Sequence, residues 1–138
     1  MSILSCSGKA PIKMGPSELG LAPCPSSPNC VSSDAVDEGH RVEALRLAVP
    51  PEQAWQSVRD ALSKLPRTTV VEDTASYLHV ECASAIFGFV DDLELELRAP
   101  EDQIAVRSAS RLGYSDMGVN RKRVEALRQT LRERGAVQ

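Results

Sequence analysis

The densest group of polar side chains lies between residues 107 and 121. Arg107 and Arg111 are four positions apart, and in a β-strand that spacing places both guanidinium groups on one face. The segment then passes a glycine and enters a stretch with helical spacing, where free N–H groups at a helix N-terminus attract anions. The candidate ligand-binding residues are therefore Arg107, Ser108, Ser110, Arg111, Ser115, Asp116, Asn120 and Arg121, with Asp91 and Asp92 from a neighbouring segment.

The same residues also have a structural interpretation. Asp91 and Asp92 could pair with the arginines and lock the corner between the last strand and the last helix. Buried ion pairs alone do not distinguish such a lock from a ligand site. Residues 107–134 hold eight basic and three acidic residues, which fits either an anion-binding face or the solvated side of a helix. Both interpretations stay open at this stage.

Sequence motifs for catalysis are absent. There is no Gly-x-Ser-x-Gly, Walker loop, His-Glu-x-x-His or dinucleotide fingerprint. His40 lies in a proline-rich stretch and His79 has no partner at catalytic spacing, so an enzyme is not the favoured class. No cofactor and no metal site is predicted. Tyr114 is the one aromatic residue in the basic segment, which argues against nucleic acid as a partner.

The cysteines indicate a disulfide and a lipid anchor. Cys24 and Cys30 lie six positions apart in a proline-stiffened loop, where a disulfide is sterically feasible and a metal would need further ligands. Cys82 occupies an inward position of an alternating strand and is expected to be buried. Cys6 follows a short apolar stretch, as at the end of a bacterial lipoprotein signal, but only five residues precede it. A trimmed signal and an accidental likeness both remain open.

These residues are positioned by a small α+β domain. Residues 1–40 hold five of the nine prolines and are expected to form an irregular Pro/Ser-rich arm, followed by one domain at 41–138. Alternating or β-branched runs predict strands, and helical spacing after a proline start predicts helices. The predicted order is β-α-β-β-β-β-α, with strands at 42–49, 68–72, 77–82, 91–98 and 103–110 and helices at about 51–65 and 117–134.

The predicted sheet has about five antiparallel strands, with two helices packed on one face. The other face would carry His79, Glu81, Asp92, Glu94 and Arg107. Ser115 or Asp116 is expected to cap the last helix. No apolar run approaches the roughly 20 residues that span a bilayer.

Three blocks of the chain resemble domain-of-unknown-function family 1499. They are residues 21–33 around the paired cysteines, residues 77–81 running into 87–92, and residues 107–111 with 113–116 and 120–123. The resemblance implies a protein of bacteria or plastid-bearing lineages, often made behind a secretory or lipoprotein signal. It implies an oxidising compartment for Cys24 and Cys30, and it transfers no activity and no catalytic residue.

The sequence therefore predicts a non-enzymatic binding or accessory module of the cell envelope, periplasmic and lipid-anchored through Cys6. A short native N-terminus would instead predict a cytoplasmic protein. The expected partner is an unidentified protein or a small anionic ligand, with membrane contact only through the anchor. One alternative is an undescribed hydrolase or transferase that uses Asp91, Asp92, His79 or a serine. Another is a purely structural accessory subunit.

Overall fold

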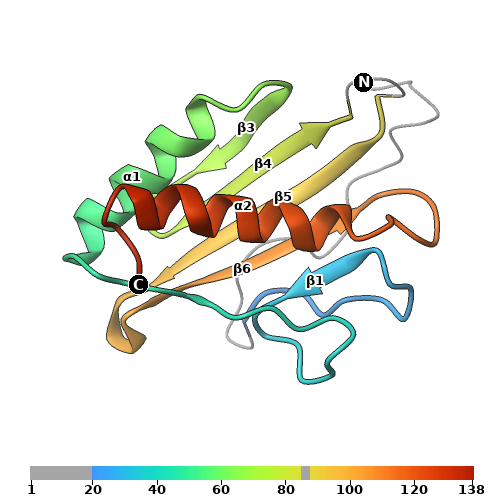
Figure 1. The fold of residues 1–138 in the computed structure, drawn as a ribbon, viewed down its shortest axis with the longest axis horizontal. Helices are drawn as coiled ribbons and strands as arrows, with labels where there is room; N and C mark the ends of the chain where they lie inside the picture. Colours follow the sequence, from blue (N-terminus) through green and yellow to red (C-terminus); the bar gives the residue numbers. More distant parts are fainter. Residues whose placement is uncertain (1–19, 85–87) are drawn as a thin grey trace.

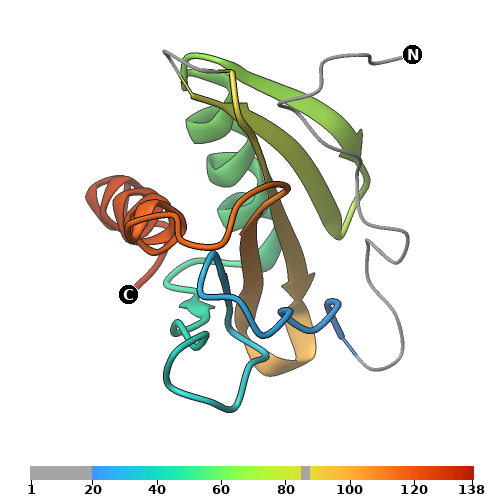
Figure 2. The same cartoon turned by 90° about the vertical axis from the view of Figure 1, so that its right-hand side faces the viewer.

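The computed structural model describes residues 20–84 and 88–138, which form an antiparallel sheet with two α-helices on one side (Figures 1 and 2). This confirms the predicted α+β class. The strands are β1 (Cys30–Ser32), β2 (Leu45–Arg46), β3 (Thr68–Asp73), β4 (Tyr77–Ala83), β5 (Val90–Arg98) and β6 (Gln103–Ser110). The helices are α1 (Pro51–Ser63) and α2 (Val119–Glu133), with a 3-10 turn at Ala99–Glu101.

The sheet has the strand order β1-β6-β5-β4-β3, and β2 pairs with the opposite end of β6 from β1. The four strands from β3 to β6 follow one another as a meander, and the bounds of β6 agree with the prediction. At the outer edge, β3 contains a bulge between Val70 and Glu72. The strict alternation of β5 sends Leu93 and Leu95 towards the helices and Asp92 and Glu94 to the other side.

The hydrophobic core lies between the sheet and the two helices. Pro51 starts α1, where its missing N–H costs nothing. Each fully buried leucine or valine contributes roughly 1.5–3 kcal/mol through its removal from water. The core includes Trp55, Val58 and Leu62 of α1, Val124, Leu127 and Leu131 of α2, and Leu78, Val80, Leu93, Leu95, Ile104 and Val106 of the sheet. Neither helix of the described residues is long and apolar enough to cross a membrane.

Two segments near the N-terminus differ from the prediction. A strand was expected over residues 42–49, but β2 contains only Leu45 and Arg46, and the N–H of Ala48 bonds to the carbonyl of Ala136 instead of to β6. An irregular arm was expected to residue 40, yet β1 pairs with β6 within it. Val31, at the centre of β1, belongs to the core, so the short strand is stabilised by tertiary packing rather than by a local pattern.

The corner between β6 and α2 also differs in detail. The helix begins at Val119 instead of 117, and the N-cap position is Gly118, whose φ of 80° suits a residue without a Cβ. Asp116 nevertheless accepts hydrogen bonds from the N–H groups of Gly118 (2.8 Å) and Asn120 (2.9 Å). One of the two predicted capping residues therefore binds free N–H groups of the helix, from two positions before the cap.

Candidate functional site

The predicted site residues separate onto the two faces of the sheet. Side chains alternate along a strand, so Arg107 and Arg111 point away from the helices whereas Ser108 points towards α2. We call the first group the outer-face cluster: Tyr77, His79, Glu81, Asp92, Glu94, Arg107 and Arg111. We call the second the helix-face cluster: Asp91, Ser108, Ser110, Asp116, Asn120 and Arg123.

Asp92 is the centre of one half of the outer-face cluster. Its side chain is only 1% exposed, and it accepts hydrogen bonds from Nε of Arg111 (2.8 Å) and from a terminal nitrogen of Arg111 (2.8 Å). Nε2 of His79 lies 2.7 Å from Oδ1, the oxygen that also accepts from the terminal nitrogen of Arg111. Arg111 also reaches Glu81 at 2.6 Å. Burial alone would raise the pKa of Asp92, but the hydrogen bonds from Arg111 and His79 outweigh it and hold that pKa below its usual value.

Glu94 is the centre of the other half. The Tyr77 hydroxyl donates a hydrogen bond to Oε2, and Arg107 donates one to Oε1 at 3.4 Å. Burial and the adjacent carboxylate raise the pKa of Tyr77, so the phenol keeps its proton and acts as a donor. A second nitrogen of Arg107 bonds to the carbonyl of Pro23 at 3.2 Å. This half of the cluster therefore connects the sheet to the segment that precedes the disulfide.

The outer-face cluster offers little surplus positive charge to an anion. Glu81, Asp92 and Glu94 oppose the two guanidinium groups, and Arg111 is already bonded to two carboxylates. The buried Nε of Arg107 has no acceptor among the residues that the structure describes. That single donor is the feature of this face that best fits the predicted small-ligand site.

Asn120 organises the helix-face cluster. It is fully buried, and its amide nitrogen donates to Ser110 Oγ (2.8 Å), Asp116 Oδ2 (2.9 Å) and the carbonyl of Asn29 (3.2 Å). Its oxygen accepts from Ser108 (2.6 Å) and Arg123 (2.8 Å). Arg123 in turn pairs with Asp91 at 2.8 Å. Every polar atom of the Asn120 side chain is thus bonded within the protein, and the first turn of α2 is fixed onto β6 and β5.

Two predicted site residues join neither cluster. Arg121 donates to the carbonyls of Arg41 (2.7 Å) and Gly39 (3.2 Å) and so holds the loop that follows β1. Ser115 is exposed, and its hydroxyl accepts a hydrogen bond from the N–H of Met117 at 3.3 Å. The side chains of one continuous polar run therefore point to the two faces of the sheet, to the loop after β1 and to solvent.

Six residues of these networks were not among the predicted ligand-binding residues: Tyr77, His79, Glu81, Glu94, Arg123 and Asn29. The alternation of their strands gives a signal for Tyr77 and Glu94, because both share a face with Asp92 and Arg107. Arg123 lies three positions after Asn120, on the same side of α2. Asn29 contributes through its backbone carbonyl from 91 positions away, and no sequence pattern indicates that contact.

The cysteines and His40 have structural roles. Cys24 and Cys30 form the predicted disulfide, with Cα atoms 5.7 Å apart. Cys82 is free and buried, as predicted, and burial raises the pKa of its thiol. His40 bonds through Nε2 to the carbonyl of Ser27 and through Nδ1 to Asp37, and these contacts raise its pKa. Cys6 lies outside the described residues, within which no group of His, Cys, Asp and Glu side chains is arranged to hold a metal ion.

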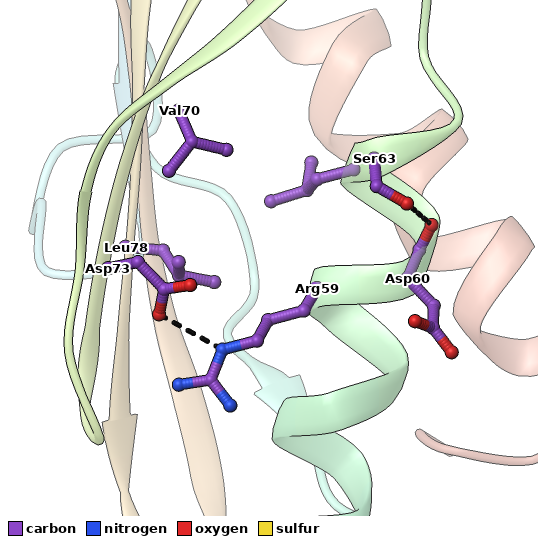
Figure 3. A pocket seen from close by; sticks show the side chains of 7 residues that line it. Arg59, Asp60, Ser63, Val70, Asp73 and Leu78 are labelled. Carbon is purple, nitrogen blue, oxygen red and sulfur yellow. Dashed lines mark hydrogen bonds and ion pairs between the residues drawn. The ribbon is translucent and has the colours of Figure 1, made fainter.

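A groove of about 240 Å³ lies between α1 and β3, away from both clusters (Figure 3). The side chain of Arg59 reaches across it and pairs with Asp73 at 2.9 Å. Ser63 donates its hydroxyl hydrogen to the backbone carbonyl of Asp60 (2.8 Å). The lining, which contains none of the predicted site residues, consists of Arg59, Asp60, Leu62, Ser63, Val70, Asp73 and Leu78.

One protein-family model matches most of the chain. The model of the family described as "Protein of unknown function (DUF1499)" matches residues 20–131, which include both clusters and the disulfide. The chain belongs to the DUF1499 family. No curated protein and no solved structure matches it. Membership in DUF1499, a family of unknown function, carries no activity to this domain.

Proposed function

We propose that this DUF1499 domain is a non-enzymatic binding or accessory module of the cell envelope, and that it binds through the corner between β6 and α2. The observation that carries the proposal is a contrast within the corner. Its polar side chains are bonded to one another, whereas Leu112, Tyr114 and Met117 are exposed to solvent. A fixed loop that presents apolar side chains is a typical binding surface.

The pairing of the polar groups favours a surface partner over a small anionic ligand. Arg111 and Arg123 are both bonded to carboxylates, and Arg121 is bonded to two backbone carbonyls. An anion would have to displace these contacts before it could be held. In this proposal the arginines position the corner, and the exposed side chains make the contact.

The cell-envelope assignment is supported by the disulfide. Disulfides persist in oxidising compartments and are rare in the cytosol, and the Cys24–Cys30 bridge lies beside the carbonyl that Arg107 binds. The lipid anchor at Cys6 remains part of the proposal. Fractionation of the native host, with alkylation of free thiols before lysis, tests the compartment. Recovery of alkylated Cys24 from the soluble cytosolic fraction would contradict it.

Photo-crosslinking tests the binding surface. A photoreactive amino acid at position 114 of the full chain, expressed in the native host, should give a covalent adduct with a protein or a lipid. The matched control places the same amino acid at position 36, because Val36 is an apolar residue even more solvent-exposed than Tyr114 but lies in the loop after β1. The proposal fails if position 114 gives no more adduct than position 36.

One observation favours an enzymatic alternative. The carboxylate of Asp92 lies 2.7 Å from Nε2 of His79, and a carboxylate that orients an imidazole is a recurring arrangement for a general base. Ser108 and Ser110 belong to the helix-face cluster, so the nucleophile would be water. A panel of carboxylic and phosphate esters tests this alternative, with His79→Gln as the diagnostic variant. The enzymatic alternative is rejected if the original protein hydrolyses none of the esters, or if the His79→Gln variant keeps the same activity.

A further inference from the structure

Three connections of the chain, which precede β3, join β4 to β5 and follow β6, lie at one end of the sheet. Thr68, Cys82, Asp91 and Ser110 are paired in one row across β3, β4, β5 and β6. The residues beyond that row therefore lie at the same end of the sheet although they are far apart in the sequence, with β4 and β5 between the connection before β3 and the one after β6 (Figure 1). We call this region the loop end; it comprises residues 64–67, 88–89 and 111–119 with the first turn of α2.

Exposed apolar side chains gather at the loop end. Met117 is 86% exposed and Tyr114 is 71% exposed. At the opposite end of the sheet, the connections 74–76 and 99–102 contain no exposed large hydrophobic residue. The exposed large hydrophobic residues of the loop end are Leu65, Phe89, Leu112, Tyr114, Met117 and Val119, which are most of those found among the described residues.

Basic side chains accompany these apolar residues. Lys64, Arg67 and Lys122 are exposed, and none of them forms an ion pair with another described residue. The carboxylate of Asp116 is directed inwards, to the N–H groups of α2. The connections at the opposite end carry Glu101 and Asp102 and no basic residue. The exposed charged side chains of the loop end that form no ion pair with another described residue are therefore basic, and they give this region a positive surface charge.

The β6–α2 connection is held in the conformation that exposes its apolar side chains. Asn29 donates from its side-chain nitrogen to the carbonyl of Gly113 at 2.8 Å. Met117 has a φ of 55°, which is unfavourable for a residue with a side chain. The Asn29 side chain therefore fixes the start of the loop, and the side chains of Ser115 and Asp116 accept hydrogen bonds from the N–H groups of Met117 and Gly118 within it.

We infer that the loop end binds the surface of a membrane that contains anionic lipids. The apolar tips would enter the interface between headgroups and acyl chains, and the free basic side chains would lie against the lipid phosphates. Tyr114 suits this position, since tyrosine places an apolar ring and a polar hydroxyl across the boundary. The inference rests on the proposed binding role of the corner and names its partner.

A membrane fits the loop end better than a protein partner does. A stable protein interface buries about 800 Å² on each side and is usually drawn from a broad face. At the loop end the apolar side chains lie on the tips of separate connections, backed by paired charges such as Arg111 with Asp92. Insertion of a few apolar tips beside basic residues is what binding to an anionic lipid surface requires.

Vesicle co-sedimentation tests the inference with the full, unlipidated chain. Vesicles of phosphatidylcholine with about a third phosphatidylglycerol should sediment the protein, and pure phosphatidylcholine should sediment at least about tenfold less. Replacing Tyr114 and Met117 together by serine should weaken binding to the anionic vesicles by about tenfold or more. Val36→Ser is the matched control and should bind as the original protein does.

Charge variants separate the two contributions. Lys122→Glu should lower binding several-fold and reduce its dependence on salt, whereas Arg134→Glu, on the exposed end of α2 remote from the loop end, should not. No sedimentation with anionic vesicles overturns the inference, as does equal loss in the two charge variants. Protein adducts from position 114 combined with no vesicle binding would reject the membrane and keep the proposed binding role. If position 114 gives no specific adduct and the protein does not bind vesicles, the membrane inference and the proposed binding role are both rejected.

Discussion

The outer-face and helix-face clusters differ in how they satisfy buried polar groups. In the outer-face cluster, carboxylates and guanidinium groups from adjacent strands pair directly, as Asp92 does with Arg111. In the helix-face cluster, the neutral amide of Asn120 is the hub, and one ion pair lies beside it. The first cluster joins the strands to the segment before the disulfide, and the second joins a helix to the sheet.

This difference shows which contacts respond to solution conditions. Two opposite charges that have lost their water depend on each other, because removal of one leaves the other buried without a partner. Hydroxyl and amide groups keep the same charge at every pH, so their hydrogen bonds are affected mainly by geometry. The outer face should therefore be the more sensitive to charge removal and to acid, and the helix face the more sensitive to shape.

The largest effect is expected for Asp92→Ala. The change leaves Arg111 and His79 without their shared carboxylate, and it should lower the free energy of unfolding by about 3–5 kcal/mol. Urea denaturation measures it. The matched control is Asp73→Ala, which breaks the more exposed pair with Arg59 and should cost below about 1 kcal/mol. Equal costs for the two variants would show that the outer-face pairing is no stronger than a surface ion pair.

Asn120→Ala should have the next largest effect. It removes the hydrogen bonds that the buried Asn120 side chain makes with Ser108, Ser110 and Arg123, at a cost of about 2–3 kcal/mol. Hydrogen exchange should accelerate at the first turn of α2 and stay slow in β4 and β5. Gln129→Ala, on the exposed side of the same helix, is the control. Faster exchange in β4 instead would mean that the two clusters are one cooperative unit.

Removal of the disulfide should affect the outer face by a smaller amount. Replacing Cys24 and Cys30 by serine opens a loop of six positions, which should lower the free energy of unfolding by about 2 kcal/mol. Proteolysis should then cleave residues 20–30 faster, since the bond from Arg107 to Pro23 no longer acts on a pinned segment. Dithiothreitol should reproduce the effect in the original protein and leave the double variant unchanged.

The smallest expected difference between the two clusters is in how their contribution to the free energy of unfolding changes with pH. The folded-state pKa of Asp92 lies below its unfolded value of about 3.9. Its stabilising contribution is therefore complete above about pH 5 and is lost as the pH falls through the folded-state pKa. The cost of Asp92→Asn should shrink over that range, whereas the cost of Ser108→Ala should stay nearly constant. A constant cost for Asp92→Asn would mean that its charge contributes nothing.

Much of the fold could be predicted because local patterns and tertiary packing agree in β4, β5 and β6. Their alternation gave the correct face for His79, Asp92 and Arg107. The strand β1 could not be predicted, because three residues carry no period and Val31 is buried only by packing against elements distant in the sequence. The division of the site follows from the same alternation, since neighbours such as Arg107 and Ser108 must point to opposite faces.

The contacts of the corner were harder to predict. Asn120 was recognised as a polar residue at a helix start, but its partner Asn29 is supplied by the loop that the disulfide closes. Arg121, one position later, points to the loop at Gly39 instead. A helix turns by about 100° at each residue, so adjacent side chains meet different elements, and the sequence alone does not say which elements are there.

The pairing of β1 with β6 has a consequence for the order of folding. Ser32 of β1 faces Arg107 of β6, so this edge of the sheet forms only after nearly all of the chain has been made. The disulfide joins cysteines separated by six positions, and loops of that size close in well under a microsecond. Oxidation can therefore precede folding, and the nascent chain can carry a closed cysteine loop before its partner strand emerges.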